Sequence, residues 1–167
     1  MNVIYLHTHD SGRFLDPANS PRALPHISRL AAEAVTFRNA FSAAPTCSPS
    51  RSALLTGTAP HVNGMLGLAH RGFRIHDYSH HIRRVFSDAG METVLCGVQH
   101  VAPDKAEIGY DRVLDGPVDY FTRPELSPHE WDRENAGRVA AYLREEHVRP
   151  FFLSYGLLTT HRPYPEV

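Results

Sequence analysis

Lysine is almost absent from this sequence: Lys105 is the only one, and the other sixteen basic residues are arginines. Lysine and arginine together number 17 against 18 acidic residues, so the formal net charge is only -1. Without an excess of positive charge, there is no electrostatic reason to expect a nucleic-acid partner or an anionic membrane surface. Any anion that this chain binds must therefore be held by a local group of donors.

Cysteine is also scarce, because the 167 residues contain only Cys47 and Cys96. Two cysteines so far apart, with no CxxC pair, exclude both a zinc knuckle and a disulfide framework. A single bridge between Cys47 and Cys96 stays open as an alternative, although disulfides are rare inside cells.

Long apolar runs are missing too. The chain starts with MNVIYLHTHDSGR, which contains neither the basic nor the apolar region of a secretory leader. No later stretch reaches the roughly 18 apolar residues that a membrane span requires. We therefore expect a soluble, cytoplasmic protein with no membrane partner, and the sequence carries no signal for its oligomeric state.

Hydrophobic residues make up 42% of the chain, enough to build the core of one globular domain. Short apolar runs that predict strands alternate with segments of helical periodicity, which indicates βαβ units and a mainly parallel sheet with helices on both faces. The expected strands cover residues 3–7, 92–97 and 150–158, and the expected helices cover 25–35, 49–57, 79–89 and 130–147.

Two further segments bear on the domain organisation. Residues 101–128 contain four prolines and read as a long excursion rather than a linker, since helix and strand patterns resume after them. The last residues follow directly on an apolar strand, so we expect 1–167 to be the N-terminal part of a larger α/β domain.

The stretch TCSPSRSALLTG, residues 46–57, predicts a short helix with Ser48 as N-cap, Pro49 at the first helical position and Gly57 at its end. Cys47 would then lie beside the helix N-terminus, where unpaired N–H groups and the helix dipole favour an anion. Arg51, in the first turn, could hold an oxyanion through paired hydrogen bonds. The alternative is structural: Cys47 as a small buried hydrophobe and Arg51 as a surface residue.

This stretch resembles the signature of the type I sulfatases, in which Cys-x-Pro-Ser-Arg is followed by a Leu/Met-Thr-Gly ending. The matching residues are Cys47, Pro49, Ser50, Arg51, Leu55, Thr56 and Gly57. Other segments are similar in the same order, including LPHISRLAAEAVTF, APHVNGMLGL and RPFFLSYGLLTTHRPY. The elements NGMLGL and GVQHVAPD resemble the branch that contains the heparan N-sulfatases. The resemblance implies an alkaline-phosphatase-like α/β fold.

For Cys47, the resemblance implies oxidation to formylglycine by a formylglycine-generating or radical maturase enzyme. The hydrated aldehyde is a geminal diol, of which one oxygen attacks sulfur while the other later expels sulfate by re-forming the aldehyde. A plain thiol could not complete that second step. The implied roles are nucleophile precursor for Cys47 and charge stabilisation for Arg51.

Two histidines match later family motifs. His100, in CGVQHVAPD, corresponds to a histidine that assists the diol, and His161, in TTHRPY, to one that contacts the sulfate or protonates the leaving group. Both follow expected strands, where α/β enzymes place catalytic groups. Where many members carry a lysine, however, this chain has Val98, so Lys105, Gln99 or an arginine would have to make that sulfate contact.

The family's metal site begins with two aspartates after the first strand, but here the pair reads His9-Asp10. The resemblance implies a divalent metal, of which calcium is the first expectation, with Asp10 and His9 as candidate ligands. Imidazole is a poor calcium ligand and suits zinc, manganese or iron. Alternatively, Asp10 is a turn or capping residue. The remaining family ligands would lie beyond residue 167, so we expect this polypeptide alone to bind metal weakly and to be inactive.

The expected substrate is a sulfated small molecule or sugar. Two alternative functions remain. One is a phosphate or phosphonate monoester hydrolase of the same superfamily, because a helix N-terminus and an arginine suit either tetrahedral anion. The other is a non-catalytic remnant of the fold.

Overall fold

The computed structural model describes residues 1–12, 20, 23–116 and 126–162. Its centre is a four-stranded sheet in the order β1-β4-β2-β3, in which every neighbouring pair is parallel. The strands are β1 (Val3–His7), β2 (Glu92–Gly97), β3 (Arg112–Val113) and β4 (Phe151–Gly156). All six residues of β4 are buried, as expected for a central strand covered on both faces.

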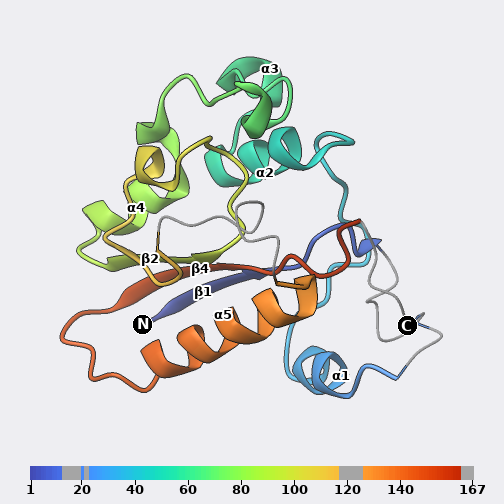
Figure 1. The fold of residues 1–167 in the computed structure, drawn as a ribbon, viewed down its shortest axis with the longest axis vertical. Helices are drawn as coiled ribbons and strands as arrows, with labels where there is room; N and C mark the ends of the chain where they lie inside the picture. Colours follow the sequence, from blue (N-terminus) through green and yellow to red (C-terminus); the bar gives the residue numbers. More distant parts are fainter. Residues whose placement is uncertain (13–19, 21–22, 117–125, 163–167) are drawn as a thin grey trace.

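Helices cover both faces of this sheet (Figure 1). On one face α5 (Pro128–Tyr142) packs against alternate residues of the central strands, through the cluster Val94, Cys96, Val139, Tyr142, Phe151, Leu153 and Tyr155. On the other face lies α4 (Ile82–Asp88), where Phe86 stacks on Phe152 at 4.2 Å between ring centroids. The predicted α/β architecture with a parallel sheet is thus confirmed.

A second core lies on the α4 side of the sheet, and most of its elements come from residues 47–80. It contains α2 (Cys47–Thr56), α3 (Pro60–Asn63) and the short 3-10 turns η2 (Ala69–Arg71) and η3 (Tyr78–His80). The turn η4 (Lys105–Ile108) packs with them. Their buried residues form one cluster, which consists of Leu55, Met65, Ala69, Ile75, Val101, Ala102 and Ile108. This core fixes α2 relative to the sheet.

Several element bounds differ from the sequence predictions. The first helix, α1 (Pro25–Ala32), ends three residues early and buries none of its residues. The helix expected at 79–89 is split by His81, whose extended backbone ends η3 and whose ring accepts the Arg83 N–H as the N-cap of α4. The strand β3, within the 101–128 excursion, was not predicted. Residues 117–125 of that excursion lie outside the described residues.

The prediction of Ser48 as an N-cap is wrong. Helix α2 begins two residues earlier than predicted, at Cys47, and its N-cap is Thr46, which makes no side-chain capping bond. The Ser48 side chain is fully buried and its hydroxyl instead accepts the Ala69 N–H at 3.1 Å, so it ties α2 to η2. Gly57 ends the helix in a left-handed conformation, φ 67°, as predicted.

No helix within the described ranges has the length and apolar content needed to cross a membrane. Both cysteines are free. Cys96 is buried and its thiol faces the carbonyl oxygen of Asn135 in α5, so the alternative of a Cys47–Cys96 bridge is not realised in this fold.

Candidate active site

The candidate site lies where the carboxyl ends of β1, β4 and β2 face the first turn of α2. Each strand is followed by a loop that carries a candidate side chain: His9 and Asp10 after β1, His100 after β2 and His161 after β4. Carboxyl ends of neighbouring parallel strands meet at one sheet edge, so residues far apart in sequence converge there. All the site residues predicted from the sequence lie in this one region.

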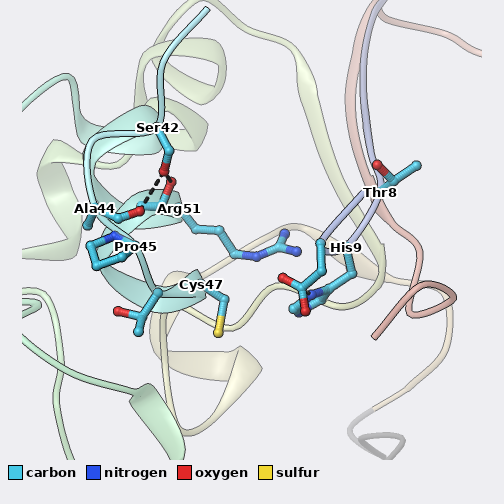
Figure 2. A pocket seen from close by; sticks show the side chains of 10 residues that line it. Thr8, His9, Ser42, Ala44, Pro45, Cys47 and Arg51 are labelled. Carbon is cyan, nitrogen blue, oxygen red and sulfur yellow. Dashed lines mark hydrogen bonds and ion pairs between the residues drawn. The ribbon is translucent and has the colours of Figure 1, made fainter. Parts of the chain in front are cut away.

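A pocket of about 210 Å³ opens between α2 and the loop after β1 (Figure 2). The Arg51 guanidinium points from α2 toward His9, and the Cys47 sulfur lies within 4.8 Å of a ring nitrogen of His9. Its lining comprises Thr8, His9, Asp10, Ser42, Ala44, Pro45, Thr46, Cys47, Ser50 and Arg51. Among these described residues, Arg51 is the only one with a permanently positive side chain, so it is the group that can pair with an anion there.

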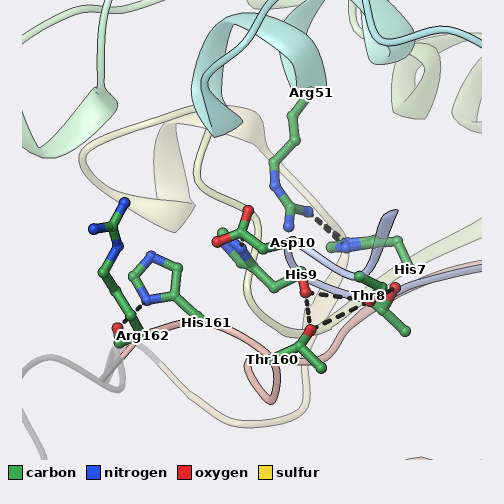
Figure 3. Close-up of polar contacts among 9 residues, drawn as sticks. His7, Thr8, His9, Asp10, Arg51, Thr160, His161 and Arg162 are labelled. Carbon is green, nitrogen blue, oxygen red and sulfur yellow. Dashed lines mark hydrogen bonds and ion pairs between the residues drawn. The ribbon is translucent and has the colours of Figure 1, made fainter. Parts of the chain in front are cut away.

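Arg51 is held in place by a residue that the sequence analysis missed. Its Nη1 lies 2.6 Å from Nδ1 of His7, the last residue of β1 (Figure 3). Because a guanidinium can only donate, Nδ1 of His7 is the acceptor and the ring is neutral. Burial, together with the Arg51 charge, lowers the pKa of His7 to about 3. The positive charge of Arg51 is therefore positioned by His7 but not neutralised by it.

The backbone beside His7 is equally restricted. A Cβ on Gly156 would lie 2.4 Å from Cε1 of the His7 ring and 2.0 Å from the carbonyl oxygen of Val98. Only glycine allows β4 to pass between these two groups. The end of β4 thus sets the distance at which the loops after β1 and β2 face each other.

Four imidazoles gather on the other side of the pocket. The ring of His9 meets that of His161 edge-on, with centroids 4.5 Å apart, and lies 6.5 Å from that of His100. His70, at the end of the segment after α3, stacks on His100 and places its Nδ1 3.0 Å from Nε2 of that ring. His70 was not predicted, and the only sequence signal was its place six residues after Gly64, the first glycine of the NGMLGL element.

The rings of His9 and His100 are uncharged at neutral pH. Burial, then the charge of Arg51, lowers the pKa of His9 to about 4, although the Asp10 carboxylate opposes this. Burial, then His70, lowers the pKa of His100 to about 4. Neutral imidazoles can accept a proton or bind a metal ion, so both rings are in the form that a base or a ligand requires.

The loops that carry these side chains adopt an unusual backbone. Among the described residues, only three that are not glycine have a positive φ: Asp10 (49°), His100 (55°) and Thr160 (82°). Such conformations cost energy and persist where the surrounding structure imposes them. Here the Thr160 hydroxyl donates to the carbonyl oxygen of His9, and Ser11 bonds to Thr160 at 3.2 Å, which joins the loops after β1 and β4.

The position where related sequences carry a lysine contains no cation in this structure. Val98 is buried against Trp131 and Leu158. Lys105 points away into an ion pair with Asp115, with 2.6 Å between Nζ and Oδ2. The Gln99 side chain bonds to the backbone of the following loop. The side chains of Lys105 and Gln99 are therefore both engaged in other contacts.

Two sets of three side chains could each hold a metal ion, and His9 belongs to both. One comprises His9, Asp10 and His161, and the other His9, Cys47 and His100, with the ligand atoms of each set within 4.8 Å of one another. Calcium takes six to eight oxygen ligands. Since the first set contains two imidazoles and one carboxylate, and the second contains no oxygen donor, the described residues do not fit calcium.

The fold and the convergence of neutral histidines, an arginine and a cysteine at the carboxyl edge of the sheet define an α/β protein with an enzyme-like polar centre. The chain belongs to the sulfatase family, because the model of that family, Sulfatase, matches residues 2–166.

Its similarity to curated proteins is consistent with this assignment. The chain is 34% identical over 161 residues to human N-sulphoglucosamine sulphohydrolase and 28% identical over 200 aligned residues to N-acetylgalactosamine-6-sulfatase of Canis lupus familiaris. Both alignments cover 92% of this chain, but it spans only 30% and 37% of those relatives. A crystal structure of a candidate sulfatase from Bacteroides thetaiotaomicron VPI-5482 has the same fold, with a TM-score of 0.75 at 22% identity, over 96% of this chain and 35% of that one.

Proposed function

We propose that the mature protein hydrolyses sulfuric esters or N-sulfates with a formylglycine derived from Cys47. The observation that carries this proposal is the arrangement of Cys47 and Arg51 on α2. Cys47 occupies the first position of the helix, Arg51 lies one turn further on, and both line the pocket with His9 and Asp10. The family to which the chain belongs acts on sulfated compounds through a nucleophile at this place in the signature.

If Cys47 is oxidised and hydrated, the resulting diol would supply one hydroxyl oxygen to attack sulfur and displace the alcohol or amine. The second hydroxyl would then lose its proton and expel sulfate as the aldehyde re-forms. Arg51 would bind the sulfate oxygens and stabilise their charge as the bond to the leaving group breaks. Its guanidinium is available for this because His7 accepts a hydrogen bond from it but brings no negative charge. The first N–H groups of α2 lie beside the same anion and add the field of the helix dipole.

His100 is suited to accept a proton from the nucleophile. Its ring is neutral, and one of its nitrogens lies within 4.8 Å of the Cys47 sulfur. The hydrogen bond with His70 fixes the orientation of the ring. His161 was predicted to contact the sulfate or to protonate the leaving group, and that role stays a prediction.

Asp10 and His9 are the proposed residues at the position of the family's metal, where a bound divalent ion would polarise the sulfate. The proposed substrate is a sulfated sugar, because the names of two relatives refer to sulfated amino sugars. The proposed partner is the enzyme that oxidises Cys47. The cytoplasmic location and the interpretation of 1–167 as part of a larger domain stay predictions.

Mass spectrometry of the protein produced with a maturing enzyme tests the modification. Trypsin releases Cys47 in the peptide of residues 39–51 and Cys96 in the peptide of residues 85–105. We expect the first peptide to have lost one sulfur and two hydrogens and to have gained one oxygen, because conversion of the cysteine CH2–SH group to an aldehyde requires that change. Cys96 is the internal control, because it is buried under α5 and should stay a thiol. An unmodified thiol at Cys47 under these conditions contradicts the proposal.

Activity is measured on aryl sulfate and phosphonate esters, with Cys47→Ala as the inactive control. Faster sulfate hydrolysis that disappears in the variant supports the proposal. Faster phosphonate hydrolysis would favour the related monoester hydrolase, and a Cys47 that stays unmodified would favour a non-catalytic remnant.

A further inference from the structure

The side chains of His9, Asp10 and His161 form a compact donor set at the sheet edge, with ligand atoms within 4.8 Å of one another. Nδ1 of His9 lies 3.2 Å from Oδ1 of Asp10. That separation is close to the roughly 3.3 Å between two ligands of a tetrahedral ion with bonds of about 2.0 Å. His161 approaches His9 edge-on from the loop after β4 (Figure 3). The three donors thus lie close enough together to bind a single ion.

The surrounding structure holds the two histidines in place. The His9 side chain is only 3% exposed, and its carbonyl oxygen is fixed by the Thr160 hydroxyl. Nδ1 of His161 lies against the carbonyl oxygen of Arg162, so this nitrogen carries the proton and the lone pair of the ring is on Nε2. A hydrogen bond of this kind from the far nitrogen is how proteins orient imidazole ligands.

The chemistry of this set selects one class of ion. Two neutral imidazoles and one carboxylate suit zinc and other divalent transition ions. Calcium affinity depends on the number of charged oxygen ligands, and here there is a single carboxylate. The guanidinium of Arg51 is close enough for its positive charge to act on His9. This charge repels a cation, which disfavours calcium because calcium is bound mainly by electrostatic attraction.

We propose that His9, Asp10 and His161 form a site for Zn²⁺ rather than for calcium, and that His161 serves as a metal ligand rather than a sulfate contact. The proposal concerns the metal position of the proposed sulfatase site and in that respect rests on the proposed function. Binding, however, requires neither modified Cys47 nor turnover, so it can be measured separately.

The test is isothermal titration calorimetry of the purified, chelator-treated protein with Zn²⁺ alone and with Ca²⁺ alone. We expect Zn²⁺ to bind at one site and Ca²⁺ to bind with at least tenfold lower affinity. Asp10→Asn and His161→Gln should each weaken Zn²⁺ binding by about tenfold or more, because each removes a direct ligand. His9→Asp recreates a carboxylate pair and should reverse the preference, with weaker Zn²⁺ and stronger Ca²⁺ binding.

Two controls identify the donor set. Cys47→Ser removes the thiol of the alternative set of His9, Cys47 and His100, and we expect it to leave Zn²⁺ affinity unchanged. His70→Gln alters an exposed neighbouring histidine outside both sets and should have no effect. Circular dichroism checks that each variant is folded, and His9→Asp remains informative through its gain of Ca²⁺ binding.

Three results would overturn the proposal: tighter binding of Ca²⁺ than of Zn²⁺ by the unaltered protein, Zn²⁺ affinity that is insensitive to His161→Gln, or loss of Zn²⁺ binding in Cys47→Ser. Failure of the proposed function has a different signature, since it appears as an unmodified Cys47 or absent sulfate hydrolysis while the titrations are unaffected.

Discussion

The ion pair between Lys105 and Asp115 allows the sharpest test of the energetics of this fold. The two side chains are 5% and 1% exposed, and Nζ lies 2.6 Å from Oδ2. The same oxygen accepts the N–H of Gly97 at 3.1 Å, at the end of β2 and three residues before His100. Burial raises the pKa of the Asp115 carboxyl, and the adjacent Lys105 opposes that shift. The charged form of this carboxylate therefore depends on its partner.

Removing one member of the pair leaves the other buried and uncompensated. Lys105→Met and Asp115→Asn should each lower the free energy of unfolding by about 3–5 kcal/mol, the usual cost of breaking a buried pair. The double variant Lys105→Met/Asp115→Leu should lose much less than the sum of two such changes, because apolar side chains can replace a buried pair at little cost. The matched control is the exposed pair of Arg84 and Asp88, where Asp88→Ala should cost under about 1 kcal/mol.

Urea denaturation of the four variants measures these differences. A second measurement uses the fact that Lys105 is the only lysine. Labelling of lysine by an amine-reactive reagent reports directly on how often this pair opens, and Asp115→Asn should increase its rate. Single variants that lose less than about 1 kcal/mol would refute the reasoning, because they would show that water screens the pair as it screens a surface pair.

Two other predictions concern pH and backbone packing. His81 is fully buried, and its burial, followed by the charge of Arg83, lowers its pKa to about 4. As the pH drops, the unfolded chain therefore binds a proton at this histidine before the folded protein does. The free energy of unfolding should fall between about pH 6.5 and pH 4, by up to about 3 kcal/mol. His81→Asn keeps an N-cap acceptor without a titrating ring, so denaturation at several pH values should show a shallower loss, and equal slopes would contradict the assignment. Gly156→Ala should destabilise the protein by about 1–3 kcal/mol, because its Cβ would meet the Val98 carbonyl oxygen and the His7 ring. The control is Gly137→Ala in α5, where the added Cβ has no atom within 4 Å, and it should stabilise the protein by up to about 1 kcal/mol. Thermal denaturation measures both variants. Similar effects at the two positions would show that close packing does not restrict position 156.

The sequence was most informative where a signal is local. Alternating strands and helices predicted the parallel sheet, and the Pro49 to Gly57 segment predicted a short helix with Cys47 beside its N-terminus. Arg51 follows Cys47 by four residues, which places both on one helix face whatever the exact first residue is. The candidate residues after the strands converged because the carboxyl ends of parallel strands share one edge.

Contacts between distant segments could not be predicted in the same way. The His7–Arg51 bond and the His70–His100 pair join elements that only the tertiary fold brings together. The Ser48 prediction was wrong for the same reason, since its hydroxyl serves the backbone of η2 rather than its own helix. Similarly, composition singled out Lys105 as the only lysine, but its use in a buried pair depends on Asp115 in a later loop.

The positive φ angles of Asp10, His100 and Thr160 have a consequence for any attempt to engineer this protein. Glycine adopts such angles without strain, so replacing any of the three with glycine would relieve the local cost of the native backbone. Each replacement would also delete a side chain from the centre. A library screened for heat resistance alone would therefore be enriched in glycine at positions 10, 100 and 160. The most stable variants would then lack the carboxylate, imidazole and hydroxyl groups that these loops place in the site. Selection for thermal stability and selection for catalytic turnover would favour different residues at these three positions.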